Sequence, residues 1–76
     1  MKIVFSSHAN LKIEQREISK DLVVSTIENP EFQRPSYGSR IEVYKNWGKN
    51  HLKVVIIKEL DAITVITTHW VAKVGD

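Results

Sequence analysis

Three side chains that carry or exchange protons recur every fourth residue near the start of the chain. His8, Lys12 and Arg16 would form one stripe along a helix, because residues four apart lie on the same helical face. Like charges at this spacing repel one another, so helix stability does not explain the pattern. An anion such as a phosphodiester would explain it. The alternative is a solvated face that neighbouring acidic residues partly neutralise.

These residues suggest acid–base chemistry on a phosphate. His8 would lie in the first helical turn, where oriented backbone amides favour a neutral imidazole, the form that accepts a proton. His69 would act as the general acid if it lies on the same side of the molecule. Lys12 and Arg16 would stabilise the negative charge of the transition state. These four residues are the predicted catalytic set.

The second half of the chain offers a candidate substrate-binding surface. Tyr44 shares the polar face of a predicted strand with Arg40, and we expect its ring to be accessible to an RNA base. Lys53 would extend the basic surface onto the neighbouring strand. His51 lies beside a turn and is expected to be exposed and without a role.

Metal and cofactor chemistry find no support in the sequence. The chain has no cysteine, and no two of its three histidines lie four residues apart, so the usual zinc-ligand spacings are missing. Glycine-rich phosphate loops and the G-x-S-x-G nucleophile motif are also missing from the sequence. We therefore expect neither a metal nor a cofactor.

Length and composition predict one small domain over residues 1–76. A chain of 76 residues has a thin core, and its 42% hydrophobic and 26% charged residues are ordinary for a globular protein. The net charge of +2 favours anionic partners only slightly. The N-terminus does not resemble a signal peptide, and no apolar run approaches the roughly 20 residues of a membrane helix. We expect a cytoplasmic protein without a membrane partner.

The elements expected to position these residues fall into a helical half and a β-rich half. Ser6 or Ser7 would cap the first helix and Ser19 the second, which Asn29-Pro30 would end. Short turns would join the last three strands into an antiparallel meander. The predicted fold is α+β, in the order β-α-α-β-β-β, with two N-terminal helices packed on a mainly antiparallel sheet. We expect strands at 2–5, 40–47, 52–57 and 63–71, helices over 8–17 and from 19 onward, and a break at 29–38.

Simple alternation also assigns the faces of the last strand. It places His69 on the same face as Ile63 and Val65, and Trp70 on the opposite face. We expect both Trp47 and Trp70 in the core, because large aromatic side chains in a small domain usually pack there.

The chain resembles a small bacterial family of unknown function whose members begin with His-Ala and continue with two arginines, a Gly-Ile-Ser step and an Asn-Pro. Two positions differ from that pattern. Lys12 stands where the family usually has arginine, which keeps the charge but loses the bidentate phosphate geometry. Glu17 stands where the family usually has glycine. The matching residues are His8-Ala9, Arg16, Ile18-Ser19 and Asn29-Pro30.

That family is similar to the RelE/ParE and BrnT-like toxins of toxin–antitoxin systems. The resemblance implies one RelE-like domain, cleavage of RNA without a metal, and a cognate antitoxin as partner. It supports His8, Lys12 and Arg16, and extends to Thr67 and His69 on the last strand. The favoured function is a type II toxin that cleaves RNA, free or on the ribosome, through attack by the 2′-OH. ParE-like toxins act on gyrase instead, so the alternative is a non-catalytic protein-binding module. Monomer and homodimer both stay open.

Overall fold

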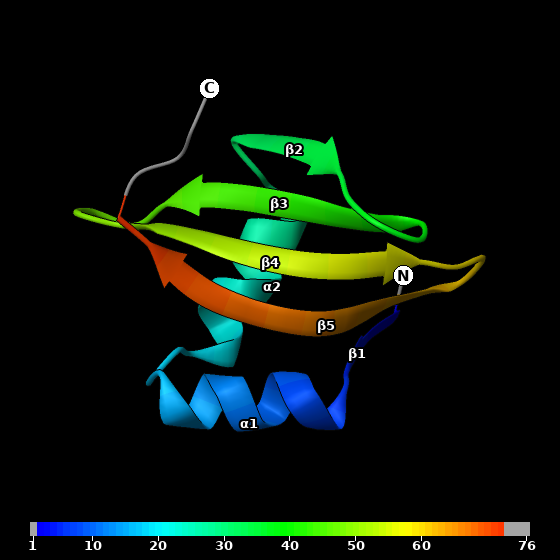
Figure 1. Ribbon diagram of the computed structural model, residues 1–76, viewed down its shortest axis with the longest axis horizontal. Helices are drawn as coiled ribbons and strands as arrows, with labels where there is room; N and C mark the ends of the chain where they lie inside the picture. Colours follow the sequence, from blue (N-terminus) through cyan, green and yellow to red (C-terminus); the bar gives the residue numbers. More distant parts are fainter. Residues whose placement is uncertain (1, 73–76) are drawn as a thin grey trace.

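A computed structural model describes residues 2–72, which form two helices and a five-stranded sheet (Figure 1). The predicted α+β class is confirmed, with both helices preceding the antiparallel meander. The elements are β1 (Lys2–Phe5), α1 (Ser7–Gln15), α2 (Lys20–Glu28), β2 (Phe32–Pro35), β3 (Arg40–Asn46), β4 (His51–Lys58) and β5 (Ala62–Val71).

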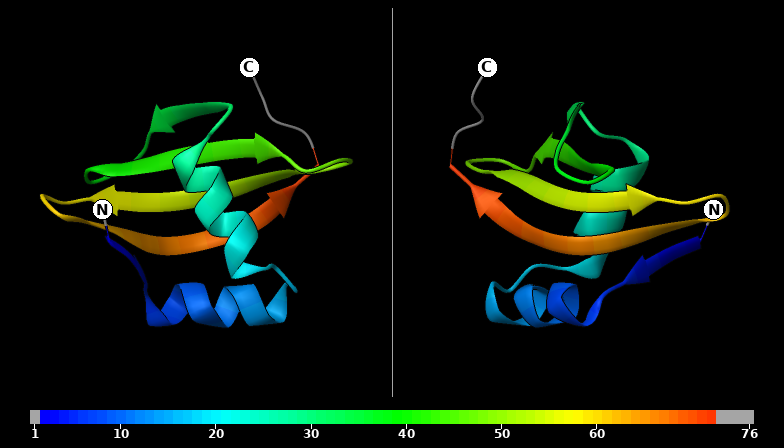
Figure 2. Two further views of the ribbon diagram at one scale, coloured as in Figure 1. Left: turned by 180° about the vertical axis from the view of Figure 1, so that it is seen from behind. Right: turned by 45° about the vertical axis from the view of Figure 1, so that its right-hand side comes forward.

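The sheet has the strand order β1-β5-β4-β3-β2. Its β1–β5 pair is parallel and the other three pairs are antiparallel, so the sheet is mainly antiparallel as predicted. Figures 1 and 2 show α2 lying across one face of the sheet, over β3 and β4, and α1 running alongside β5. The face opposite α2 is called the open face below.

The strand β2 differs from the sequence-based expectation. The two prolines indicate a break over 29–38, yet Phe32–Pro35 pairs antiparallel with β3. A proline lacks the N–H that a central strand needs, but an edge strand tolerates it. Pro35 is the last residue of a strand at the edge of the sheet, and the predicted break therefore contains a fifth strand.

The core lies between the two helices and the sheet face that α2 covers. Trp47 and Trp70 both pack against this core, which confirms their expected placement. The indole N–H of Trp47 donates to Thr26 Oγ1 at 3.0 Å, and this hydroxyl donates to the carbonyl of Leu22 at 2.8 Å. The fully buried centre of the core comprises Ala9, Val23, Leu52, Val54 and Val65.

A β-bulge in β5 changes which residues face the core. Val55 pairs with Thr67 and Ile56 pairs with Val65, so Ile66 is the extra residue. One extra residue reverses the alternation beyond it. Val65 and Trp70 therefore both face the core, and the prediction that His69 shares a face with Ile63 and Val65 is wrong. His69 lies on the open face.

Ser6 fixes the start of α1 at this bulge. Its Oγ accepts the backbone N–H of Ala9 at 3.0 Å, so Ser6 is the N-cap, one of the two positions predicted. The same hydroxyl donates to the carbonyl of Ile66 at 3.1 Å, and the Ser6 N–H donates to the carbonyl of Val65 at 3.0 Å. The beginning of the helix is thereby attached to the middle of β5.

The other end of α1 is closed by a Schellman motif. The N–H of Ile18 donates to the carbonyl of Ile13 at 2.9 Å, and the N–H of Glu17 to that of Glu14 at 3.4 Å. The helix ends at Gln15, earlier than predicted. Glu17 has a φ of 51°, in the left-handed region that favours glycine. The glycine that the resemblance implies at this position would take this conformation without strain.

Replacing Glu17 with glycine should therefore stabilise the protein. We expect Glu17→Gly to raise the free energy of unfolding by about 1 kcal/mol, because a side chain in the left-handed conformation is strained. Glu14→Gly makes the same chemical change inside the helix and should lower the free energy of unfolding by about 0.5–1 kcal/mol. Urea denaturation of both variants measures the difference. Destabilisation by Glu17→Gly would contradict this account of the helix end.

Candidate functional site

Side chains from four neighbouring strands form a row across the open face. The register places Phe32 opposite Tyr44, Tyr44 opposite Lys53, and Lys53 opposite His69. These four residues are called the cross-strand row below. Because directly opposed residues on one sheet face have neighbouring side chains, the row brings an aromatic pair, an ammonium and an imidazole together.

A carboxylate next to the row gathers three donors. Glu42 Oε1 accepts the Tyr44 hydroxyl at 2.8 Å and lies 3.3 Å from Arg34 Nε, while Glu42 Oε2 lies 3.6 Å from Lys53 Nζ. Burial disfavours the charged form of Glu42, but hydrogen bonds from Tyr44, Ser36 and Arg34 together with the Lys53 charge outweigh it, so the pKa of Glu42 lies below its usual value. Glu42 is therefore an anion that holds Lys53 and Arg34 on the open face.

Tyr44 lies on the open face, but its ring is not accessible. Only 2% of the residue is exposed. Phe32 stacks on its ring with centroids 4.7 Å apart, and the Arg34 guanidinium lies 5.1 Å from the ring centroid. The expectation that Tyr44 is accessible is wrong, because β2 covers it. Phe32, which is 37% exposed, is the aromatic residue of the row that reaches solvent.

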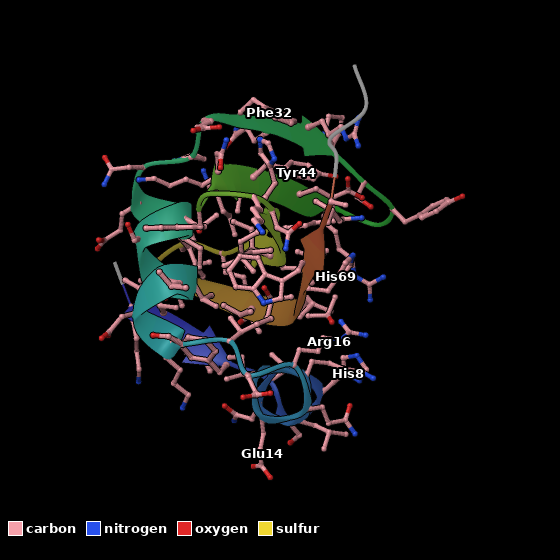
Figure 3. All side chains as sticks on the ribbon, turned by 90° about the vertical axis from the view of Figure 1, so that its left-hand side faces the viewer. His8, Glu14, Arg16, Phe32, Tyr44 and His69 are labelled. Atoms are coloured by element: carbon pink, nitrogen blue, oxygen red, sulfur yellow. The ribbon has the colours of Figure 1, made fainter. Side chains whose placement is uncertain are left out.

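His69 is half-buried and has two cations beside it. Lys53 is its partner on β4, and Arg16 Nη1 donates to the carbonyl of Thr68 at 3.0 Å. Burial lowers the pKa of His69, and the positive charges of Lys53 and Arg16 lower it further, against a smaller opposing effect of Glu42. Figure 3 shows the labelled His69 and Arg16 on the same side of the molecule. The site thus combines a neutral imidazole with two positive charges.

The predicted stripe on α1 runs alongside β5. Figure 3 views α1 nearly end-on, with His8 and Arg16 on the side of His69 and Glu14 pointing away. His8 and Arg16 are two helical turns apart, which corresponds to about 12 Å along the axis. Lys12 lies between them and donates from Nζ to Gln15 Oε1 at 3.4 Å. The structure therefore places Arg16 next to the β5 segment that carries His69, and His8 at the other end of the stripe.

The predicted substrate-binding residues separate into two groups. Lys53 belongs to the cross-strand row, and Thr67 lies on the open face opposite Val55. Arg40 is four residues from Tyr44 along β3, about 13 Å away. Lys53 and Thr67 are thus close neighbours of His69, whereas Arg40 lies at the far end of its strand.

Two residues outside the predicted set have roles that the sequence did not indicate. Glu42 gathers the donors of the open face, and only the cross-strand register reveals its partners. Phe32 provides the exposed ring, but it lies in the segment predicted as a break. His51, expected to be exposed, is partly buried, with Nε2 3.7 Å from Glu31 Oε1.

Three further features of residues 2–72 concern metal ligands, membrane helices and surface hollows. Within this range no group of three or more His, Asp or Glu side chains is placed to hold a metal ion. In the same range no helix combines the length and the apolar character needed to cross a membrane. A shallow hollow lined by Pro35, Ser36 and Tyr37 lies at the end of β2 and contains none of the predicted site residues.

Fold and site together define a small α+β domain with a cationic, histidine-containing sheet face. Residues 5–70 match the model of a family described as a domain of unknown function, DUF4258. The chain belongs to this family, which confirms the resemblance to a small family of unknown function. Searches of curated proteins and of solved structures each found no match. The family therefore supplies no activity, and any function has to be argued from the site.

Proposed function

We propose that this protein is a metal-independent endoribonuclease that cleaves RNA through attack by the 2′-OH. The observation that carries the proposal is the half-buried imidazole of His69 beside Lys53 and Arg16. A neutral imidazole accepts a proton from a hydroxyl, and two cations stabilise the charge that then develops on a phosphate.

In the proposed reaction, His69 accepts the proton of the 2′-OH as this oxygen bonds to the adjacent phosphorus. The bond from phosphorus to the 5′-oxygen breaks, and that oxygen takes up a proton. The products are a 2′,3′-cyclic phosphate and a 5′-OH. The lowered pKa of His69 suits a base better than an acid. We therefore assign His69 as the base, in place of the acid role expected from the sequence. His8 lies about 12 Å along α1 from Arg16, so the leaving 5′-oxygen takes its proton from solvent.

The positive side chains would act on the phosphate. Lys53 and Arg16 lie beside His69 and would stabilise the phosphorane-like transition state. Lys12 lies between His8 and Arg16 on α1 and would contribute a further positive charge near the strand of RNA.

The resemblance to RelE/ParE and BrnT-like toxins supplies the biological setting of the proposal. On this basis the protein would be the toxin of a type II toxin–antitoxin system, acting in the cytoplasm on RNA that is free or on the ribosome. A cognate antitoxin would be its protein partner. The match to DUF4258 itself carries no such information.

The test is an end-group analysis of RNA treated with the purified protein. We expect a labelled single-stranded RNA to be cleaved in the presence of EDTA, and the fragments to carry 2′,3′-cyclic phosphate and 5′-OH ends. Intact RNA both in this assay and in one with RNA on the ribosome, or fragments with 5′-phosphate ends, would contradict the proposal. Intact RNA would favour the alternative, a non-catalytic module that uses the open face to bind a protein.

A further inference from the structure

An exposed aromatic ring lies at the end of the cross-strand row farthest from His69. Phe32 is on the edge strand β2, and 37% of it is exposed. Three strand spacings separate it from His69, or about 14 Å between the backbones. Figure 3 shows the labelled Phe32 and His69 on different strands of the sheet. An extended ligand that reaches both residues has to cross the open face.

The ring of Phe32 is held in place before any ligand binds. It stacks on Tyr44 with an angle of 15° between the ring planes. The Tyr44 hydroxyl is in turn held by Glu42 at 2.8 Å and by Arg34 Nη2 at 3.0 Å. A fixed ring loses little conformational freedom on binding, so its contact contributes more to affinity.

The charges between Phe32 and His69 favour an anionic strand. Arg34 and Lys53 lie between these two residues and are positive, and Glu42 is the carboxylate that contacts both. Arg16 adds a positive charge beyond His69, on the α1 side. Flat rings next to a positively charged surface are the combination with which proteins hold single-stranded nucleic acid, because bases stack and phosphates pair with cations. An acidic peptide would match the charge but would offer no flat base to the ring.

We infer that Phe32 is a base-stacking position for single-stranded RNA bound along the cross-strand row, with a phosphate at Lys53 and His69. This inference rests on the proposed function, because it assumes RNA as the ligand. It adds a contact that none of the predicted site residues provides, and it assigns the open face of β2 and β3 to substrate binding.

Binding of an uncleavable RNA tests this inference separately from cleavage. A short fluorescent 2′-O-methyl oligonucleotide lacks the attacking hydroxyl, so its fluorescence anisotropy reports binding alone. We expect Phe32→Ala to weaken binding about 10-fold or more, since stacking on an aromatic side chain contributes about that much per base. Phe32→Trp should bind as tightly as the wild type. Leu60→Ala removes a fully exposed apolar side chain from the loop between β4 and β5 and should have no effect.

Phe32→Leu distinguishes stacking from a general apolar contact. Leucine keeps an apolar side chain but has no ring, so this variant should resemble Phe32→Ala in affinity. Circular dichroism of each variant checks that the sheet is intact. Wild-type affinity in Phe32→Leu and Phe32→Ala would overturn the stacking inference while leaving RNA as the ligand. Failure of the wild type to bind the oligonucleotide would overturn the proposed function as well and would favour a protein ligand on this face.

Discussion

His69→Gln should lower the rate of RNA cleavage by about 10²- to 10⁴-fold, the usual contribution of a general base. Glutamine is similar in size but cannot accept the proton of the 2′-OH. His51→Gln is the matched control, because His51 also lies in the sheet, on β4, but contacts Glu31, which directly precedes β2 at the sheet edge away from β5. Single-turnover cleavage of a labelled RNA measures both variants. A His69→Gln protein as active as the wild type would remove His69 from the reaction.

The pH dependence of cleavage provides a second readout of the same residue. A base must be deprotonated to act, and burial with the charges of Lys53 and Arg16 places the pKa of His69 below 6.5. The value of kcat/KM, which reports the free protein, should therefore rise with pH and reach half of its plateau below pH 6.5. Lys53→Met removes one of the charges that oppose protonation, so the midpoint should move to higher pH. A midpoint that moves to lower pH in this variant would contradict the assignment.

Arg16→Met should lower the cleavage rate by about 10²- to 10³-fold, the typical loss when one donor to a developing negative charge is removed. Arg16 is the C-cap of α1, and its Nη1 donates to the carbonyl of Thr68 at 3.0 Å, directly before His69 in the chain. Arg16→Lys keeps the charge but not the forked geometry and should recover only part of the rate. Cleavage and binding of the 2′-O-methyl oligonucleotide should be measured side by side.

Lys58→Met is the control for the loss of charge. It changes the net charge by the same amount as Arg16→Met, but Lys58 is opposite Ile63, on the side of the sheet that faces the core. Its cleavage rate should stay within about twofold of the wild type. Equal losses in Arg16→Met and Lys58→Met would mean that overall charge, and not the guanidinium beside His69, supports cleavage.

Local signals in the sequence were sufficient for most of the fold. Ser6 and Ser19 cap the two helices as predicted, since a short polar side chain before a helix satisfies an amide of its first turn. Alternation correctly placed Arg40 and Tyr44 on one face of β3, opposite the core residues Ile41 and Val43, because no irregularity interrupts that strand. Both features depend only on residues close together in the chain.

Features that depend on pairing between distant segments were not predicted. The bulge at Ile66 depends on the pairing of β5 with β4 and on the hydrogen bond that the Ser6 hydroxyl donates to the Ile66 carbonyl. The bulge reverses the sheet faces on which His69 and Trp70 lie. Alternation along the sequence of β5 does not show this reversal, because it assumes a regular strand. The strand β2 exists because β3 offers it an edge, and the prolines that bound it resemble those of a loop.

The candidate site was predicted in part for the same reason. Helical spacing put His8, Lys12 and Arg16 on one side of α1. Figure 3 shows His8 and Arg16 on the side of the molecule that carries His69. The burial of Tyr44 under Phe32 and the donors gathered by Glu42 require the register of three strands. Spacing within one element is visible in a sequence, whereas contacts across strands are not.

An NMR titration of the His69 imidazole, with and without the 2′-O-methyl oligonucleotide, tests the central claim most directly. The account predicts a midpoint below pH 6.5 for the protein alone. Adding the oligonucleotide should raise this midpoint, because a nearby phosphate favours the protonated ring. A His69 midpoint at or above pH 6.5 that does not change on adding RNA would contradict a neutral base in a phosphate-binding site.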